Sequence, residues 1–216
     1  VTNEIEAKRV LATIGMAVVR EAMATDADEA VTCAAEIGGP VVLKIVSPDI
    51  QHKTEIGGVL VGREGSDEVR DGFESLILRA KELIPDAQID GVAVAEMVTG
   101  GVETVIGVNN DPTFGPVVIF GLGGIFIEVM KDVTCRLAPF GVEEASRMIR
   151  EIRAFEILTG FRGGAALDLT GLSETLALVS TFAAENAGQI ESLDINPYVV
   201  LPKGGKALDA LIVQRS

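Results

Sequence analysis

The stretch GVAVAEMVTGGVETVIGVNNDPTFGPVVIFGLGG, residues 91–124, decides the fold class of this chain. It holds successive runs rich in valine and isoleucine, and short turns of the glycine, asparagine and proline type separate them. Connections this short favour antiparallel neighbours, because a parallel pair needs a crossover of a dozen or more residues. The stretch therefore predicts an α+β protein with antiparallel strands rather than a doubly wound parallel sheet.

Before this stretch, helix and strand patterns alternate. Helices are expected over residues 3–15, 25–40 and 66–85, with caps at Asn3 or Thr2, at Thr25 or Asp26, and at Ser66. Strands are expected at VVLKIVS, residues 41–47, and GVLVG, residues 58–62. After the stretch we expect strands at 125–130 and 133–140, helices at 141–160 and 171–188, and a final strand pair within 193–213 around the turn PKGGK. The change of pattern predicts two lobes with a hinge near AEMVTGG, residues 95–101.

Composition excludes several classes of function. The 32 acidic and 18 basic residues give a net charge of −14, which repels nucleic acid and anionic membrane surfaces. No apolar run reaches the roughly 18 residues of a membrane span, and residues 1–10 lack the apolar core of a signal peptide. Cys33 and Cys135 are isolated, which favours a reducing, cytoplasmic setting. The first residue is Val rather than Met, as expected for a trimmed chain or a piece of a longer one.

Lys44 and the glycine pairs are candidates for binding phosphate. Lys44 lies within the apolar run VVLKIVS, either as a phosphate ligand on the floor of a cleft or as an edge lysine that reaches into solvent. The pair Gly57–Gly58 and the run GLGG, residues 121–124, would let backbone N–H groups approach a phosphate, although glycine pairs also mark ordinary turns. No Walker motif or GxGxxG spacing occurs, which disfavours P-loop and Rossmann proteins.

A set of hard oxygen ligands lies in the last strand pair. Asp194 and Asn196 are two apart in LDINPYVV and should share a face, and Asp209 on the partner strand could face them. Two carboxylates and an amide oxygen are suited to a Mg²⁺ ion that carries nucleotide phosphates. The alternative is a solvated hairpin without a ligand.

Other polar residues fit the same chemistry less specifically. Glu96 lies at the expected hinge and Glu103 follows its glycine pair, and both suit hydrogen bonds to adenine and ribose, or they are simply solvated. Arg136 and Arg162 could neutralise anions. His52 is the only histidine and lies in the loop SPDIQHKTEIGG, residues 47–58, either as an ordinary polar residue or as a nucleophile for a phosphoryl group.

Five segments in this order and spacing resemble one known family over nearly the whole chain. They are EAKRVLATIGMAV, GPVVLKIVSPDIQHKTEIGGV, AEMVTGGVETVIGVNNDPTFGPVVIFGLGGIFIEVMKDV, LTGFRG and LDINPYVV. The family is the ATP-grasp nucleotide-binding subunit or domain of NDP-forming acyl-CoA synthetases, relatives of succinyl-CoA synthetase. The resemblance implies an ATP-grasp fold with two lobes, largely antiparallel sheets and a nucleotide cleft between the lobes. It assigns residues 19–98 to the smaller lobe and residues 1–18 with 99–216 to the larger.

The resemblance also implies an activity and its residues. Such enzymes convert acyl-CoA, ADP and phosphate reversibly to the acid, ATP and CoA, through a phosphohistidine. By position the implied roles are phosphate binding for Lys44, adenine binding for Glu96 and the Val98 backbone, ribose binding for Glu103, Mg²⁺ ligation for Asn196 and Asp209, proximity to the incoming phosphohistidine for Asp194, and phosphoryl relay for His52.

A partner is implied as well, because no CoA-binding Rossmann segment occurs in the sequence. We expect a CoA-binding α subunit or fused domain, an oligomeric assembly, and ATP/ADP with Mg²⁺ as cofactors. One alternative is a regulatory ATP-grasp domain of a fused protein lysine acetyltransferase, in which the site residues would be expected to decay. Another is an ATP-grasp carboxylate–amine ligase, which would have no use for His52.

Overall fold

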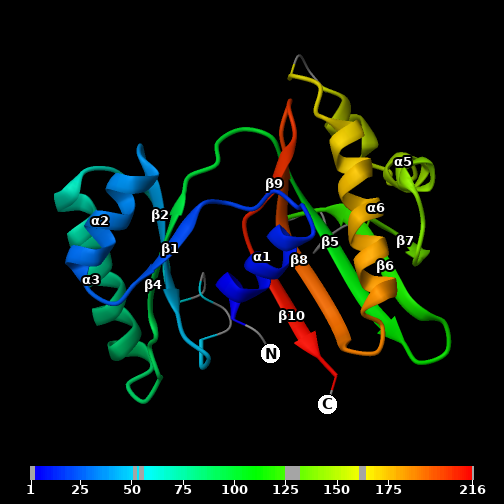
Figure 1. The fold of residues 1–216 in the computed structure, drawn as a ribbon. Helices are drawn as coiled ribbons and strands as arrows, with labels where there is room; N and C mark the ends of the chain where they lie inside the picture. The colour runs from blue at the N-terminus through cyan, green and yellow to red at the C-terminus, as the bar shows by residue number, and fades with distance from the viewer. Residues whose placement is uncertain (1–2, 51–52, 54–55, 125–131, 161–163, 216) are drawn as a thin grey trace. The chain divides into compact units, whose positions relative to one another are not determined.

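The computed structural model describes residues 3–50, 53, 56–124, 132–160 and 164–215. The chain divides into two compact units (Figure 1). Unit 1 comprises Val1–Val18 and Gly100–Ser216, and unit 2 comprises Val19–Thr99. No helix within the described ranges is both long enough and apolar enough to cross a membrane.

Unit 2 is a four-stranded antiparallel sheet with two helices on one face (Figure 1). Its strands, in spatial order, are β1 (Glu21–Ala24), β4 (Gly91–Glu96), β2 (Val41–Val46) and β3 (Val59–Arg63). Its helices are α2 (Ala27–Ile37) and α3 (Ser66–Leu83). Alternate residues Leu43 and Ile45 of β2 pack against Val69, Phe73 and Leu76 of α3, so the intervening positions of β2 face away from the helices.

The helix ends of unit 2 follow local chemistry with one exception. Asp26 caps α2, because its carboxylate accepts the Glu29 N–H at 2.8 Å, and Gly38 ends this helix at φ +77°. The predicted cap at Ser66 is wrong. Ser66 is the first residue of α3, and the cap position is Gly65, which supplies no side-chain bond. Strand β1 was not predicted, since it is only four residues long and pairs with a single neighbour at the sheet edge.

Unit 1 is built on a larger antiparallel sheet, which confirms the prediction from residues 91–124. Its path is β10 (Ala210–Gln214), β8 (Ile190–Val200), β5 (Val102–Asp111), β6 (Gly115–Leu122) and β7 (Val133–Leu137), and β9 (Gly205–Ala207) also pairs with β8. The expected final strand pair is thus three strands, because Leu208 and Asp209 interrupt the pairing between β9 and β10. The strand expected at 125–130 lies outside the described residues.

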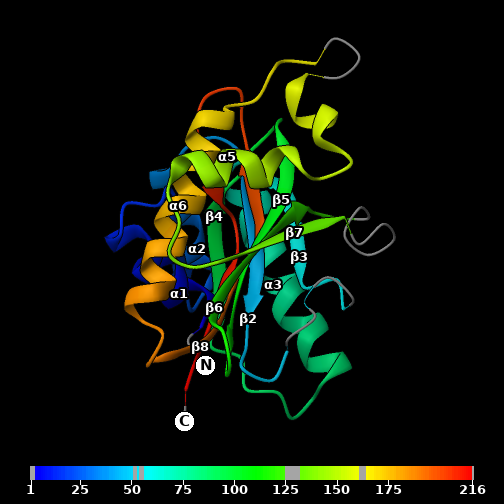
Figure 2. The same cartoon turned by 90° about the vertical axis from the view of Figure 1, so that its right-hand side faces the viewer.

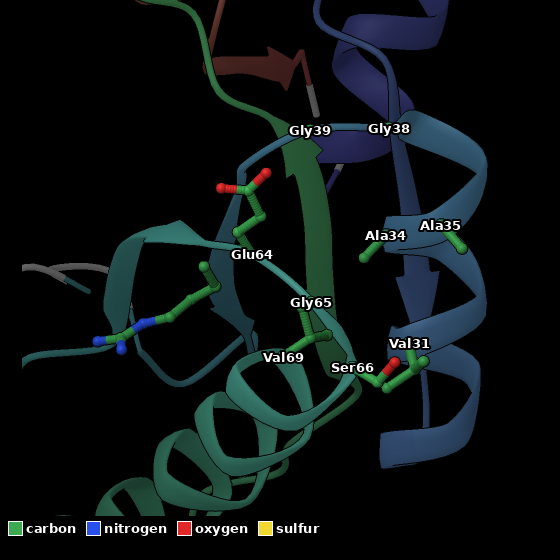
Figure 3. Close-up of a pocket in the computed structure, with 10 residues that line it drawn as sticks. Val31, Ala34, Ala35, Gly38, Gly39, Glu64, Gly65, Ser66 and Val69 are labelled. Carbon is green, nitrogen blue, oxygen red and sulfur yellow. The ribbon is translucent and has the colours of Figure 1, made fainter.

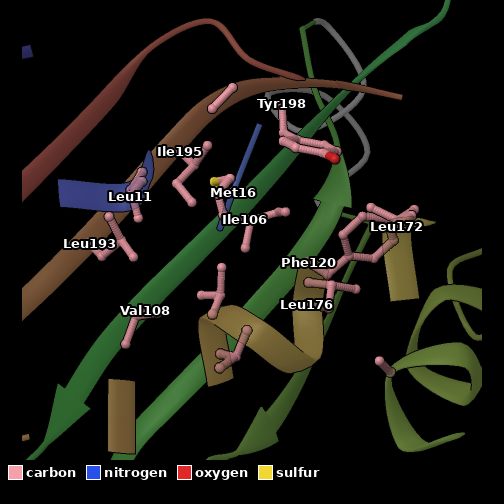
Figure 4. Packing of buried hydrophobic residues seen from close by; sticks show 14 of the residues in the cluster. Leu11, Met16, Ile106, Val108, Phe120, Leu172, Leu176, Leu193, Ile195 and Tyr198 are labelled. Atoms are coloured by element: carbon pink, nitrogen blue, oxygen red, sulfur yellow. The ribbon is translucent and has the colours of Figure 1, made fainter. Parts of the chain in front are cut away.

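Three helices cover one face of this sheet. They are α1 (Glu4–Thr13), α5 (Val142–Arg150) and α6 (Leu169–Glu185), and α5 lies across α6 (Figure 2). Leu11 of α1, Phe120 of β6 and Leu176 of α6 share one apolar core with Leu193 and Ile195 of β8 (Figure 4). Asn3 caps α1 as predicted. Val10 of α1 is exposed, whereas the charged residues Glu4 and Lys8 are buried.

The single helix expected over residues 141–160 is interrupted. Helix α5 ends at Arg150, and a short 3₁₀ helix, η1, covers Phe155–Thr159. Between them, the buried carboxylate of Asp132 accepts the N–H groups of Arg153 and Ala154, both at 2.9 Å. These two donors therefore leave the helical hydrogen-bond ladder. The interruption depends on a residue distant in sequence, which the helical pattern does not reveal.

Asp168 ties the start of α6 to the turn between β8 and β9. Its carboxylate accepts the Gly171 N–H, as a helix cap, and the Gly204 N–H, both at 2.8 Å. Helix α6 thus begins at Leu169, before the predicted start at Gly171. The hydrogen bonds from Gly171 and then Gly204 lower the pKa of Asp168 below its ordinary value of 3.8.

Replacing Asp168 should weaken this tie. We expect Asp168→Ala to lower the free energy of unfolding by about 1–2 kcal/mol, because both amide donors lose their acceptor. Urea unfolding followed by far-UV circular dichroism measures the loss. Glu174→Gln, an exposed change on the same helix, is the control and should leave the midpoint within error. An equal loss in both variants would contradict the assignment.

The same tie should depend on pH. A carboxyl whose folded pKa is depressed stabilises the fold above its unfolded pKa, here 3.8, and loses that contribution as the pH falls through the folded pKa. The stability difference between the wild type and Asp168→Ala should therefore be full at neutral pH and shrink below about pH 3.8. A difference that grows on acidification would contradict this sign.

Candidate functional site

In unit 1, the candidate metal ligands lie where β8 departs from regular pairing. Thr104 of β5 pairs with Tyr198, but Ile106 pairs with Ile195, so β8 contains one more residue than β5 across this interval. Such a bulge re-aims side chains and interrupts the ladder. The extra residue falls in the Asn196–Pro197 region, between strand positions that are otherwise in register.

Asp194 and Asn196 share the face of the sheet opposite the helices, as their spacing predicts. Leu193 and Ile195 are buried in the core, whereas Asp194 and Asn196 are exposed. After the bulge the buried positions shift to Tyr198 and its neighbours, so the alternation changes at this point. The exposed oxygens of both side chains are therefore directed away from the hydrophobic core.

Asp209 lies beside Asn196 across the strand connection. The Asn196 N–H donates to the Asp209 carbonyl oxygen at 3.2 Å, and the Leu208 N–H donates to the Pro197 carbonyl oxygen at 2.9 Å. These bonds hold the connector between β9 and β10 against the bulge. Asn196 and Asp209 are thus neighbours through the backbone, and Asp209 is half-buried.

The surroundings of Asp194 change the pKa of its carboxyl group. Its neighbours across the sheet are Gly107 on β5 and Leu211 on β10, neither of which supplies a charge. Although Asp194 keeps exposed surface, desolvation by its surroundings raises the pKa of its carboxyl above the ordinary 3.8. Gly107 leaves room beside the carboxylate, because it carries no side chain. A desolvated acid is suited to exchanging or orienting a proton.

Glu103 lies against the glycine pair at the end of β6. The Gly123 N–H donates to the Glu103 carbonyl oxygen at 2.8 Å. A Cβ atom at Gly123 would lie 3.2 Å from the Glu103 Cβ, and one at Gly124 would lie 3.8 Å from its Oε2. The exposed Glu103 side chain therefore lies close to the backbone of Gly123 and Gly124. These two glycines allow that close approach because they carry no side chains, so this part of GLGG is more than an ordinary turn.

In unit 2, Lys44 lies on an interior strand. Its Cα partners are Ala93 on β4 and Val59 on β3, so the edge-lysine alternative is wrong. Leu43 and Ile45 are directed into the core, and Lys44 is on the opposite face, half-buried. Because β2 is paired on both sides, the backbone of Lys44 is held in place. This suits a residue whose ammonium group must lie at a defined position.

The pair Gly57–Gly58 closes the loop that contains His52. The Gly58 N–H donates to the Lys53 carbonyl oxygen at 2.7 Å, and the Gly58 carbonyl oxygen accepts the Ile45 N–H at 2.9 Å. The Arg79 guanidinium of α3 donates to the Gly57 carbonyl oxygen at 2.8 Å. Because the Gly58 N–H is engaged within the loop, the pair serves loop closure here, and a phosphate contact from Gly58 would require that bond to open.

Glu96 at the end of β4 is tied to Arg20. Its carboxylate accepts the Arg20 N–H at 2.9 Å and the Arg20 Nε at 3.2 Å, and its own N–H donates to the Arg20 carbonyl oxygen at 2.9 Å. This carboxylate therefore fixes the segment that precedes β1. Val98 follows β4 in the last residues of unit 2. The sequence interpretation did not identify Arg20, whose contact joins residues 76 apart.

The remaining candidates separate into two groups. His52 and Arg162 lie outside the described residues. Arg136 is committed to structure, because it donates to Glu144 at 2.7 Å and to both carboxylate oxygens of Glu151 at 2.7 Å. These bonds, with that to Glu151 first, raise the pKa of Arg136 and hold β7 against α5. Arg136 is therefore not available as a general anion ligand.

A pocket of about 250 Å³ in unit 2 does not coincide with these residues. It lies between the end of α2, at Ala34 and Ala35, and the start of α3, at Ser66 and Val69 (Figure 3). Within the described ranges, no group of three or more His, Cys, Asp and Glu side chains converges on a metal position. The metal candidates are thus the amide of Asn196 with nearby carboxylates, and not a preformed cage.

Comparison with known proteins identifies the family. A family model for the ATP-grasp domain matches residues 1–213 of the chain. The chain belongs to the ATP-grasp family. This ATP-grasp chain is 41% identical over 210 residues to the subunit beta of acetate–CoA ligase [ADP-forming] I from Pyrococcus furiosus, and the match covers 97% of this chain and 90% of that subunit.

Solved structures agree with this assignment. The dinucleotide-forming acetyl-coenzyme A synthetase 1 of Ca. Korarchaeum cryptofilum, in complex with coenzyme A, Ca-AMPCP and HgCl⁺, is 42% identical with a TM-score of 0.96, and the match covers 99% of this chain and 93% of that one. Its complex with coenzyme A and Mg-AMPPCP has a phosphohistidine segment that points towards the nucleotide binding site. This structure is 39% identical with a TM-score of 0.87, covering 98% and 92% of the two chains. These matches confirm the predicted ATP-grasp fold.

The packing around Gly58 leads to a test of loop closure. A Cβ atom at this position would lie 2.7 Å from Ile45 Cγ2 and 2.9 Å from the Lys53 carbonyl oxygen. We expect Gly58→Ala to cost about 1–3 kcal/mol of stability, because the strand and the loop must separate to admit the methyl group. Urea unfolding measures the cost. Gly188→Ala is the control, since no atom lies within 4 Å of its added Cβ. Equal midpoints for the two variants would refute the packing argument.

Proposed function

We propose that this chain is the nucleotide-binding component of an NDP-forming acyl-CoA synthetase, an acid–thiol ligase. It would transfer a phosphoryl group between ADP/ATP and an enzyme phosphohistidine, in the reversible conversion of acyl-CoA, ADP and phosphate to acid, ATP and CoA. The observation that carries this proposal is the match of about two fifths identity to an ADP-forming acetate–CoA ligase subunit over nearly the full length of both chains. Nucleotide analogues and a phosphohistidine segment in the matched structures support it.

Asn196 and Asp209 are the proposed Mg²⁺ ligands. One amide oxygen and one carboxylate fit this ion, which proteins usually hold through one or two side chains while water and nucleotide phosphate complete its shell. The backbone bond from Asn196 to Asp209 keeps the two residues together, which supports the pairing. When bound, the ion would neutralise phosphate charge, and the two side chains would orient the nucleotide tail.

Lys44, Glu103 and the segment Glu96–Val98 are the proposed nucleotide contacts. Lys44 would hold a phosphate with a charge fixed on an interior strand, and the exposed Glu103 carboxylate would accept ribose hydroxyls. For adenine, we propose Glu96 and the Val98 backbone, with Arg20 holding Glu96 in place through its carboxylate and its N–H. The glycines Gly57 and Gly58 would act mainly by shaping the loop.

His52 is the proposed phosphoryl relay, and Asp194 is the acid proposed to lie near the incoming phosphohistidine. A neutral imidazole nitrogen would attack the phosphorus, so that an N–P bond forms as the bond to the donor breaks, and the reverse step would deliver the group to ADP. Asp194 would orient an incoming histidine through its ring N–H. The raised pKa of Asp194 and the lack of a side chain on its cross-strand neighbour Gly107 support this role.

A CoA-binding partner would complete the reaction. We propose an α subunit or a fused CoA-binding domain, since the matched ligases include separate beta subunits and longer chains of which this sequence covers about 30%. Acyl selectivity would then lie in that partner. The relatives are named as ligases, which disfavours the regulatory acetyltransferase domain. An oligomeric assembly and a cytoplasmic location remain predictions.

The metal assignment predicts a loss of Mg·ADP binding. Asn196→Ala combined with Asp209→Ala should weaken Mg·ADP at least about tenfold by calorimetry, because both protein ligands of the ion are lost. Binding of ADP in EDTA should change little, which separates metal ligation from damage to the nucleotide contacts. Unchanged affinity for Mg·ADP would contradict the assignment.

The relay assignment predicts interrupted phosphoryl transfer. In the enzyme assembled with its CoA-binding partner, His52→Ala should stop label from γ-³²P-ATP from reaching the partner histidine, since the intermediate carrier is missing. Gln51→Ala, in the same loop, is the matched control and should transfer label normally. Normal labelling of the partner by His52→Ala would show that the phosphoryl group travels directly.

A further inference from the structure

Lys8 of helix α1 is a fully buried charge with no role in the nucleotide chemistry proposed above. It is 1% exposed, and its Nζ donates to the Glu4 carboxylate at 2.8 Å on the same helix. Glu4 is itself only 7% exposed. Burying such a pair costs desolvation free energy that an apolar pair of similar size would avoid. A residue that only filled space here would not need an ammonium group.

The ammonium group of Lys8 also reaches the far end of the chain. Its Nζ donates to the carbonyl oxygen of Leu208 at 3.0 Å, across 200 residues of sequence. Leu208 directly precedes Asp209 in the connector between β9 and β10. Lys8 therefore holds, from the helix side, the peptide that leads into a proposed metal ligand.

The opposite side of the same connector is held by the β8 bulge. The Leu208 N–H donates to the Pro197 carbonyl oxygen at 2.9 Å, and the Asp209 carbonyl oxygen accepts the Asn196 N–H at 3.2 Å. The two-residue connector is thus fixed between α1 and β8. Its backbone cannot shift toward or away from Asn196 without breaking a bond to Lys8 or to the bulge.

We propose that Lys8 is a positioning residue for the metal site: it fixes the Leu208–Asp209 connector so that the Asp209 carboxylate is held beside Asn196. The inference rests on the proposed role of Asn196 and Asp209 as metal ligands. Partners outside the first coordination shell commonly set metal affinity by orienting ligands, and their removal typically costs about 10- to 100-fold in affinity. Lys8 acts here through the backbone of the ligand-bearing segment.

The test removes the tie together with the Glu4 carboxylate that pairs with Lys8. Glu4→Leu combined with Lys8→Met replaces the ion pair by apolar side chains, a change that is often close to neutral for stability. The probe is Mn²⁺ with ADP, followed by the loss of the free-ion signal in electron paramagnetic resonance. We expect about 10-fold weaker Mn²⁺ binding in the double variant, together with a native circular dichroism spectrum.

Two further variants separate the explanations. Arg136→Met, which removes an ion-pair network between β7 and α5 in the same unit, controls for loss of stability and should keep the affinity of the wild type. Asp209→Ala tests the ligand itself. If Asp209→Ala binds Mn²⁺ normally, the proposed metal site is wrong. If Asp209→Ala weakens binding and the Glu4/Lys8 double variant does not, only the positioning role of Lys8 is overturned.

A second variant covers a failure of the first to fold. Lys8→Gln keeps a polar group near Glu4 but is too short to hold Leu208 in the same way. It should weaken Mn²⁺ binding more than Arg136→Met does when the two are compared at equal fractions folded. Equal affinities in these two variants would overturn the proposal.

Discussion

The pairing of β8 is the constraint on which the rest of unit 1 depends. This strand pairs with β5 on one side and with β9 and β10 on the other. Regular alternation directs Leu193 and Ile195 to the core and Asp194 and Asn196 to the opposite face, and the bulge at Asn196–Pro197 then shifts the core-facing positions to Tyr198 and Val200. A straight strand would continue a single alternation past this point. Asn196 therefore lies where the alternation changes, and two backbone hydrogen bonds hold the Leu208–Asp209 connector against this point.

In unit 2, the candidate site residues are positioned by the closure of a loop rather than by a bulge. Lys44 originates from an interior strand, and the neighbouring Ile45 N–H is bonded to Gly58 at the end of the loop that follows. Arg79 of α3 holds Gly57 in the same region. The end of this loop, at Gly57 and Gly58, is thus fixed to one strand and one helix.

The sequence predicted the antiparallel class, most helices and the alternation at Asp194 and Asn196, because these depend on local period and turn chemistry. The one histidine and the oxygen ligands could be named for the same reason. Missed features depend on contacts between distant residues: Asp132 interrupts the predicted helix by accepting N–H groups of Arg153 and Ala154, and Arg20 binds the Glu96 carboxylate. The sequence contains only a weak indication that Lys8 is buried in an ion pair: it lies four positions after Glu4, on a helix face that is otherwise apolar.

The topology of unit 1 has a consequence for how the chain acquires its structure during synthesis. Along the sequence, unit 2 comes between α1 and the strands of unit 1. Helix α1 packs beside β10, the last strand of the chain. Ala7 and Leu11 share a core with Ala210 and Ile212, so α1 leaves the ribosome long before its partners exist. Meanwhile unit 2 has all of its strands and can fold as a unit. The apolar face of α1 therefore cannot complete its packing until β10, the last strand, has been synthesised.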